Sequence, residues 1–149
     1  MPDLSYEVSD FETSSELSIS VLDGELCPRY LGCLVKDIQI KESPDWLKKR
    51  LASVGIRSIN NIVDITNFVL TEIGQPMHSF DYDLLKGQKL VIRRAGNGEK
   101  ITTLDDKEFE LNDSNLVICD ESDPQCLAGI MGGKSSCIED STKAVVFES

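Results

Sequence analysis

The segment 17–21 alternates strictly between apolar and polar residues and reads Leu-Ser-Ile-Ser-Val. An alternation with period two is typical of a strand that buries one face. A second strand region is predicted from Tyr30 to Ile40, with Gly32 as an interruption and the polar residues 41–43 as its end. The pattern therefore predicts two strands in the first 40 residues.

The period changes after Ser43, where apolar residues return every three or four positions. Ser43 can cap a helix N-terminus, and Pro44 suits the first helical position because its missing N–H needs no partner there. Gly55 can supply the left-handed residue that ends a helix. The spacing predicts an amphipathic helix over residues 44–54, with an apolar face formed by Leu47, Leu51 and Val54.

A second helix is predicted over residues 61–73. Gly74 can end it, and Pro76 prevents it from resuming. Its apolar residues recur at helical spacing, which places one apolar face on Ile62, Ile65, Val69 and Ile73.

Strands and turns dominate after residue 88, with strands expected at 90–94, 101–104, 109–111, 116–119 and 145–147. Helices grouped early and strands grouped late favour an α+β fold. We expect a β-rich domain with mixed sheets or a sandwich, and two short helices in its first half. The 149 residues suit a single domain over residues 1–149, in which residues 1–16 form a loose acidic lead.

The formal net charge is −11, from 26 acidic and 15 basic residues. Such a charge repels phosphate backbones, which argues against a stand-alone nucleic-acid binder. The main basic cluster is expected to be a solvated face and consists of Lys48, Lys49, Arg50 and Arg57. No apolar run approaches the roughly 20 residues of a membrane span, and the N-terminus lacks the features of a signal peptide. We therefore expect no membrane contact and a cytoplasmic location.

Five cysteines are an odd number, and none is separated from the next by two residues. This pattern favours free thiols over a disulfide framework. With only one histidine in the chain, a metal site is not expected.

Three segments could carry chemistry. His78 is predicted to lie in a loop after the second helix, where it is either a hydrogen-bonded structural residue or a catalytic one. Segment 128–133 contains three glycines, which fit either a tight turn or a place where a ligand approaches the backbone. The third segment is a polar cluster on or beside an apolar helix, which either forms an internal network or serves a pocket: Asn60, Asn61, Asp64, Thr66 and Asn67.

Three motifs in order resemble the editing domain of bacterial-type phenylalanyl-tRNA synthetase beta subunits. They are Ile59-Asn60-Asn61-Ile62-Val63-Asp64-Ile65-Thr66-Asn67, Gly74-Gln75-Pro76-Met77-His78-Ser79-Phe80-Asp81 and Ala128-Gly129-Ile130-Met131-Gly132-Gly133. The similarity covers residues 25–149. One departure is Leu104-Asp105-Asp106, where the family has Leu-Asp-Gly, and this change is expected to alter only a turn.

The resemblance implies a hydrolase that removes tyrosine attached to tRNA in error. It implies that Glu148 accepts the phenol proton and that Gly129 and Ala128 line the pocket. It places Thr66, Asn67 and His78 near the aminoacyl ester. The apolar amino-acid pocket of an aminoacylation site discriminates poorly against a substrate that only adds a hydroxyl. A second site that binds the hydroxyl is therefore chemically useful.

The resemblance also implies partners. The family is a heterotetramer of two alpha and two beta subunits, in which the alpha subunit charges tRNA with phenylalanine and uses ATP and magnesium. No cofactor is expected in the editing domain itself, and tRNA(Phe) is expected to bind mainly through other domains. The chain would then be a fragment of a longer subunit whose domain continues beyond Ser149. The alternative is a non-catalytic docking or architectural module of the same complex.

Overall fold

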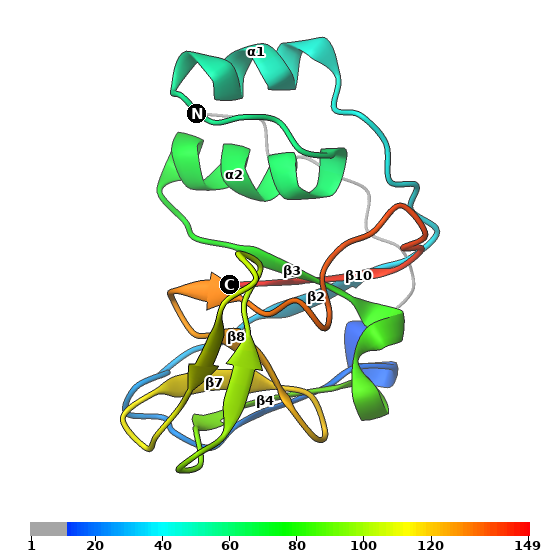
Figure 1. Cartoon of the computed structure of the whole chain (residues 1–149). Coiled ribbons are helices and arrows are strands. Elements are labelled where there is room, and N and C mark those ends of the chain that lie inside the picture. The colour runs from blue at the N-terminus through cyan, green and yellow to red at the C-terminus, as the bar shows by residue number, and fades with distance from the viewer. Residues whose placement is uncertain (1–11) are drawn as a thin grey trace.

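Three β-sheets and a pair of helices form the part of the chain that the structure describes, residues 12–149 of a computed structural model (Figure 1). The largest sheet has five strands in the order β1-β4-β7-β8-β9. Strand β1 is parallel to β4, and the other pairs are antiparallel. The bounds of these strands are Ser18–Val21 (β1), Lys89–Arg94 (β4), Leu116–Cys119 (β7), Pro124–Leu127 (β8) and Met131–Gly132 (β9).

The second sheet has three antiparallel strands in the order β2-β10-β3, so the C-terminal strand lies in its centre. Its strands are β2 (Gly32–Val35), β10 (Val145–Glu148) and β3 (His78–Asp81). The third sheet is a hairpin of β5 (Lys100–Thr102) and β6 (Glu108–Glu110). Mixed and antiparallel sheets with two helices confirm the predicted α+β fold.

Two apolar clusters hold the sheets together. In the larger one, side chains from the five-stranded sheet pack against Leu34, Phe80 and Val146 of the three-stranded sheet. The smaller one covers the opposite face and includes Ile101, Val117 and Leu127. Neighbouring residues of a strand point to opposite faces, so β7 is buried on both sides and contributes to both clusters. These cores fix β8 and β10, which carry much of the site described below.

The helices α1 (Asp45–Ser53) and α2 (Asn61–Ile73) pack against each other at one end of the molecule (Figure 1). The bounds of α2 match the prediction, and α1 is one residue shorter at each end. Gly55 and Gly74 both have a positive φ, at 80° and 75°, as expected for residues that end helices. The prediction that Ser43 caps α1 is wrong: its Oγ instead donates a hydrogen bond to Asp64 Oδ2 (2.5 Å).

The predicted apolar face of α2 is only partly buried. Ile62 is buried, but Ile65 and Ile73 remain 42% and 61% exposed. The side chain of Asp64 is buried instead. It accepts hydrogen bonds from Ser43, which precedes α1, and from the Ser58 hydroxyl and a backbone N–H in the segment between the two helices. Hydrogen bonds to Asp64 thus hold α2 to the segments that precede the two helices. The spacing of its apolar residues does not predict which face of the helix is buried.

Several strand predictions need correction. The expected strand from Tyr30 to Ile40 is confined to Gly32–Val35, and Asp37 adopts a positive φ of 56° soon after it. His78 begins strand β3 and does not lie in a loop. Strands β3, β8 and β9 have no counterpart in the prediction.

Three short 3-10 turns complete the chain, at Thr13–Ser15, Tyr82–Leu84 and Lys86–Gln88. The predicted acidic lead over residues 1–16 lies mostly outside the described residues. Within its described part, Thr13 Oγ1 accepts a hydrogen bond from the backbone of Leu34 (3.0 Å). Lys48, Lys49, Arg50 and Arg57, the predicted solvated basic cluster, lie at the surface or are half-buried.

Candidate functional site: a pocket between two sheets

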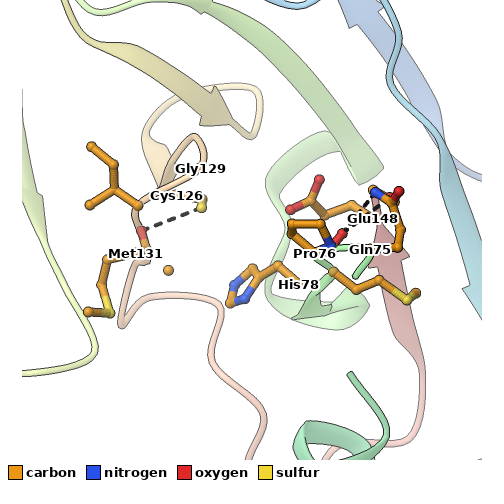
Figure 2. Close-up of a pocket in the computed structure, with 11 residues that line it drawn as sticks. Gln75, Pro76, His78, Cys126, Gly129, Met131 and Glu148 are labelled. Atoms are coloured by element: carbon orange, nitrogen blue, oxygen red, sulfur yellow. Dashed lines mark hydrogen bonds between the residues drawn. The ribbon is translucent and has the colours of Figure 1, made fainter. Parts of the chain in front are cut away.

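A pocket of about 360 Å³ lies where the three-stranded sheet meets the β8–β9 hairpin (Figure 2). This volume lies within the range of small-ligand sites. The segment before β3, the end of β10 and the hairpin supply its walls. Its lining consists of Gln75, Pro76, Met77, His78, Cys126, Gly129, Ile130, Met131, Gly132, Glu148 and Ser149.

His78 and Glu148 are brought together by strand register. They are direct partners in the antiparallel β3–β10 pair. Residues directly opposite each other in such a pair project from the same face of the sheet. The pocket therefore contains one imidazole and one carboxylate from segments 70 residues apart in the sequence.

The His78 ring is held between apolar neighbours and backbone. It packs edge to face against Phe80, with ring centroids 4.7 Å apart. Gly132 also lies close to the ring, because an added Cβ there would be only 2.4 Å from His78 Cε1. Burial lowers the pKa of His78 to about 4, so the imidazole is neutral near pH 7. A neutral imidazole can accept a proton from water or orient it.

The Glu148 carboxylate is partly withdrawn from water. Burial raises its pKa, and an interaction with the Tyr30 side chain opposes part of that rise. Glu148 in turn affects a neighbouring thiol: burial and the nearby carboxylate raise the pKa of Cys126 to about 12. Cys126 is therefore a protonated thiol at neutral pH, and its Sγ donates to the carbonyl of Met131 (3.4 Å).

Glycines shape the hairpin wall. Gly129 turns the chain between β8 and β9 with a φ of 71°, and no atom lies within 4 Å of the position that its Cβ would take. At Gly133 an added Cβ would be 2.7 Å from the carbonyl oxygen of Gln125. The first glycine is needed for the turn, and Gly132 and Gly133 allow close packing.

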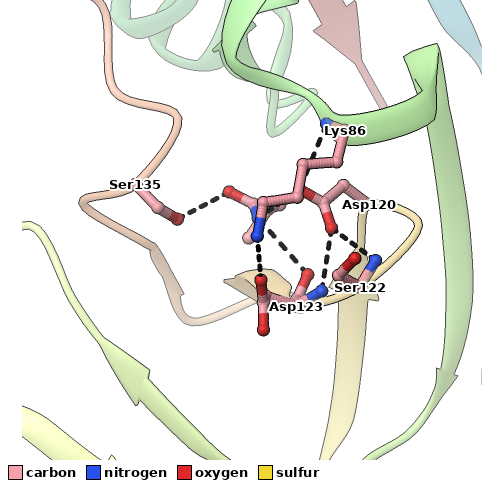
Figure 3. Close-up of polar contacts among 6 residues, drawn as sticks. Lys86, Asp120, Ser122, Asp123 and Ser135 are labelled. Atoms are coloured by element: carbon pink, nitrogen blue, oxygen red, sulfur yellow. Dashed lines mark hydrogen bonds and ion pairs between the residues drawn. The ribbon is translucent and has the colours of Figure 1, made fainter.

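A polar network anchors the start of the hairpin (Figure 3). Asp120 is buried, and its Oδ1 accepts hydrogen bonds from the backbone of Ser122 and Asp123. Its Oδ2 accepts from Gln125 Nε2 (2.9 Å), and Gln125 Oε1 accepts from Ser135 Oγ (2.6 Å). Because its bonds are satisfied within the fold, this network has a structural role.

The sequence-predicted site residues fall into two groups. His78, Gly129 and Glu148 line the pocket, whereas Thr66, Asn67 and Ala128 are not among its lining residues. Thr66 is buried, and its Oγ1 donates to the carbonyl of Val63 within the helix (2.8 Å). The catalytic or binding role of each of these residues stays a prediction.

The polar cluster on α2 is largely an internal network. The Asn60 side chain caps the helix by accepting from the backbone N–H groups of Ile62 and Val63. The Asn61 amide bonds to the backbone of residues 39 and 41. Together with the three bonds that Asp64 accepts, these contacts account for most of the cluster without a ligand.

Sequence reasoning missed the contribution of Cys126, Gly132 and Tyr30. Cys126 and Gly132 are register partners in a hairpin whose strands were not predicted. The available signal was the glycine-rich segment 128–133, which contains Gly132. Tyr30 is not among the pocket-lining residues but interacts with Glu148, and its own segment could not predict that neighbour.

The five cysteines, all within the described residues, are free, as predicted. Residues 12–149 contain no cluster of three or more histidine, cysteine, aspartate or glutamate side chains arranged to hold a metal. In the same part of the chain, no helix has the length and apolar character needed to cross a membrane.

The structure is an α+β domain with a candidate pocket between two sheets, and comparison with known proteins gives its family. Residues 26–149 match the model of the B3/4 domain, so the chain belongs to the B3/4 domain family. The chain is 46% identical over 148 residues to the phenylalanine–tRNA ligase beta subunit of Bdellovibrio bacteriovorus. The aligned region covers 99% of the chain and 18% of that protein.

The beta subunit of Carboxydothermus hydrogenoformans is 49% identical over 135 residues, or 91% of the chain and 17% of that protein. The chain thus spans less than a fifth of the length of these relatives. A solved N-terminal fragment of the phenylalanyl-tRNA synthetase beta subunit from Pyrococcus horikoshii has the same fold, with a TM-score of 0.66 at 13% identity. That match covers 99% of the chain and 45% of the fragment.

Proposed function

We propose that the chain is the proofreading domain of a phenylalanine–tRNA ligase beta subunit and hydrolyses tyrosine from mischarged tRNA. The observation that carries the proposal is the half-buried Glu148 carboxylate, which shares one pocket with the neutral imidazole of His78. The beta-subunit relatives support the wider context. In this proposal an alpha subunit performs the ATP-dependent charging step, and tRNA binds mainly through other domains.

Glu148 supplies the specificity. A tyrosyl phenol donates a hydrogen bond to the carboxylate, whereas a phenylalanyl ring covers the same carboxylate without giving it a partner. Sites built to bind a substrate hydroxyl reject the analogue that lacks it, because their own polar group is then left unpaired. The pocket thus selects tyrosine by binding its hydroxyl, in contrast to the apolar amino-acid pocket of an aminoacylation site.

His78 acts on the water. The neutral imidazole accepts a proton as the water oxygen bonds to the ester carbonyl carbon, and the bond from that carbon to the tRNA oxygen then breaks. The same proton passes to the departing tRNA hydroxyl, so free tyrosine and uncharged tRNA are the products. Gly132 lets the His78 ring lie close to the hairpin backbone, where any larger residue would displace it.

The test compares variants of the assembled ligase that contains this chain. Glu148→Ala removes a charge-assisted hydrogen bond of roughly 1.5 to 3 kcal/mol, so tyrosyl-tRNA hydrolysis should fall by about 10- to 150-fold. Phenylalanine charging should stay near the wild-type rate. Glu110→Gln is the matched control, because that carboxylate is exposed on β6 and does not line the pocket.

Equal losses of charging and hydrolysis in Glu148→Ala would refute separate sites. A wild-type ligase that does not hydrolyse tyrosyl-tRNA would favour the alternative, a docking module. His78→Asn completes the set: it should slow hydrolysis of tyrosyl-tRNA without reducing the binding of a tyrosyl analogue.

A further inference from the structure

Tyr30 lies just before β2, on the same face of the sheet as Glu148. Leu31 and Ser149 exchange backbone hydrogen bonds in both directions, at 2.8 and 3.0 Å, and so extend the β2–β10 pairing by one residue. Gly32 is the direct partner of Glu148. Side chains two residues apart on a strand share a face, so Tyr30 projects beside Glu148 and no Gly32 side chain separates them.

The Tyr30 hydroxyl is a buried polar group in need of a partner. Within residues 12–149 its oxygen makes no hydrogen bond of standard geometry. Among residues 12–149, Glu148 is the carboxylate that acts on it, and burial together with this carboxylate keeps the pKa of Tyr30 far above its ordinary value. The phenol is therefore always protonated, a donor facing an acceptor. Hydrogen bonds of a site without its substrate are often long or misaligned and tighten on binding.

From this placement we infer that Tyr30 is a positioning residue, whose hydroxyl donates to the Glu148 carboxylate and directs it toward the phenol of the substrate. The inference rests on the proposed function. Glu148 would then receive two donors, the hydroxyl of Tyr30, which does not line the pocket, and the tyrosyl hydroxyl of the substrate in the pocket. A carboxylate has enough lone pairs to accept both.

The surroundings of Glu148 make this donor important. Its titratable neighbours among the described residues are Tyr30 and Cys27 before β2, His78 on β3 and Cys126 on β8. None of them is a cation at neutral pH, because the pKa of His78 is about 4. Tyr30 is the neighbour that stabilises the ionised carboxylate. Without it, burial acts unopposed and the carboxylate becomes harder to ionise.

The experiment uses the assembled ligase and measures hydrolysis of tyrosyl-tRNA and phenylalanyl-tRNA across pH. The ratio of the two hydrolysis rates removes effects on steps that are common to both substrates. Tyr30→Phe should lower the ratio by about 10-fold, the size expected for one charge-assisted hydrogen bond. The acidic limb of the ratio should move to higher pH, because the ionised form of Glu148 loses its donor and the pKa of the carboxyl rises.

Two further variants separate positioning from general structure. Tyr82→Phe is the matched control, because Tyr82 packs against the same core and its hydroxyl donates to the carbonyl of Glu16 (3.1 Å), away from the pocket. It should behave as wild type. In a Glu148→Gln background, Tyr30→Phe should cause no additional loss of the ratio, because its effect acts through the carboxylate.

An unchanged ratio and pH profile in Tyr30→Phe would overturn the inference while leaving the proposed function intact, provided that Glu148→Gln remains defective. An equal loss in the presence and absence of Glu148 would also overturn it, since that result indicates a structural role. A wild-type ligase with no preference for tyrosyl-tRNA would overturn both proposals.

Discussion

The contact between Gly132 and the His78 ring gives a sharp quantitative prediction. In Gly132→Ala the new Cβ would lie 2.4 Å from Cε1 and 2.6 Å from Nε2 of His78. Carbon atoms in ordinary contact are about 3.5 Å apart, so the ring must move by about 1 Å. Gly132 has no positive φ, so the effect comes from the side chain and not from backbone strain.

Two effects of different size should follow. Overpacking costs about 1 to 3 kcal/mol in the free energy of unfolding, which a folded domain can tolerate. A misplacement of about 1 Å in a catalytic group can cost on the order of 100-fold in rate. Hydrolysis of tyrosyl-tRNA should therefore fall by about 100-fold while most of the protein stays folded.

The assay measures tyrosyl-tRNA hydrolysis and thermal unfolding on the same preparation. His78 is the single histidine of the 149 residues, so the imidazole NMR signals of the isolated 149-residue chain report the displacement directly. Gly24→Ala is the control, because nothing lies within 4 Å of its added Cβ and its φ is not positive. A folded Gly132→Ala protein with shifted His78 signals but normal hydrolysis would show that the position of this ring is irrelevant to the reaction.

Three other predictions follow from the same structure. The pKa of His78 is lowered by burial to about 4 in the folded chain, so its contribution to stability is present above pH 6.5 and is lost as the pH falls toward 4. Urea unfolding should show a loss of about 3 kcal/mol over this range in wild type that is absent in His78→Gln. Asp64→Ala leaves two serine hydroxyls and one N–H without their acceptor and should lower stability by about 3 kcal/mol, whereas Glu72→Gln, exposed on the same helix, should not. Gly129→Trp should block the pocket and abolish editing with charging intact; an equal loss of both would identify Gly129 as a turn residue only.

Local patterns predicted the helices well because the signals for their ends are local. Gly55 and Gly74 act within one turn of the helix that each ends. The buried face of α2 could not be predicted in this way. It depends on Asp64, whose partners Ser43 and Ser58 come from two separate segments. A prediction from hydrophobic periodicity assigns an aspartate to the exposed face of a helix.

In the candidate site, too, some features could be predicted from sequence motifs and others depend on contacts between distant segments. His78, Gly129 and Glu148 were singled out through motif resemblance, and the fold places all three around one pocket. Their proximity depends on β10 inserting between β2 and β3, a pairing of distant segments that no local pattern reports. The contributions of Tyr30 and Gly132 depend on that register and on the β8–β9 hairpin, so they emerged only from the three-dimensional structure.

The most direct test of the account is a structure of the assembled ligase with a non-hydrolysable tyrosyl-adenosine analogue. In the proposed function the phenol oxygen lies roughly 2.5 to 3.0 Å from a carboxylate oxygen of Glu148, as a hydrogen bond requires. The proposed function also predicts that the carbonyl end of the analogue points toward His78. An analogue bound with its ring outside this pocket, or with its phenol directed away from Glu148, would contradict the account.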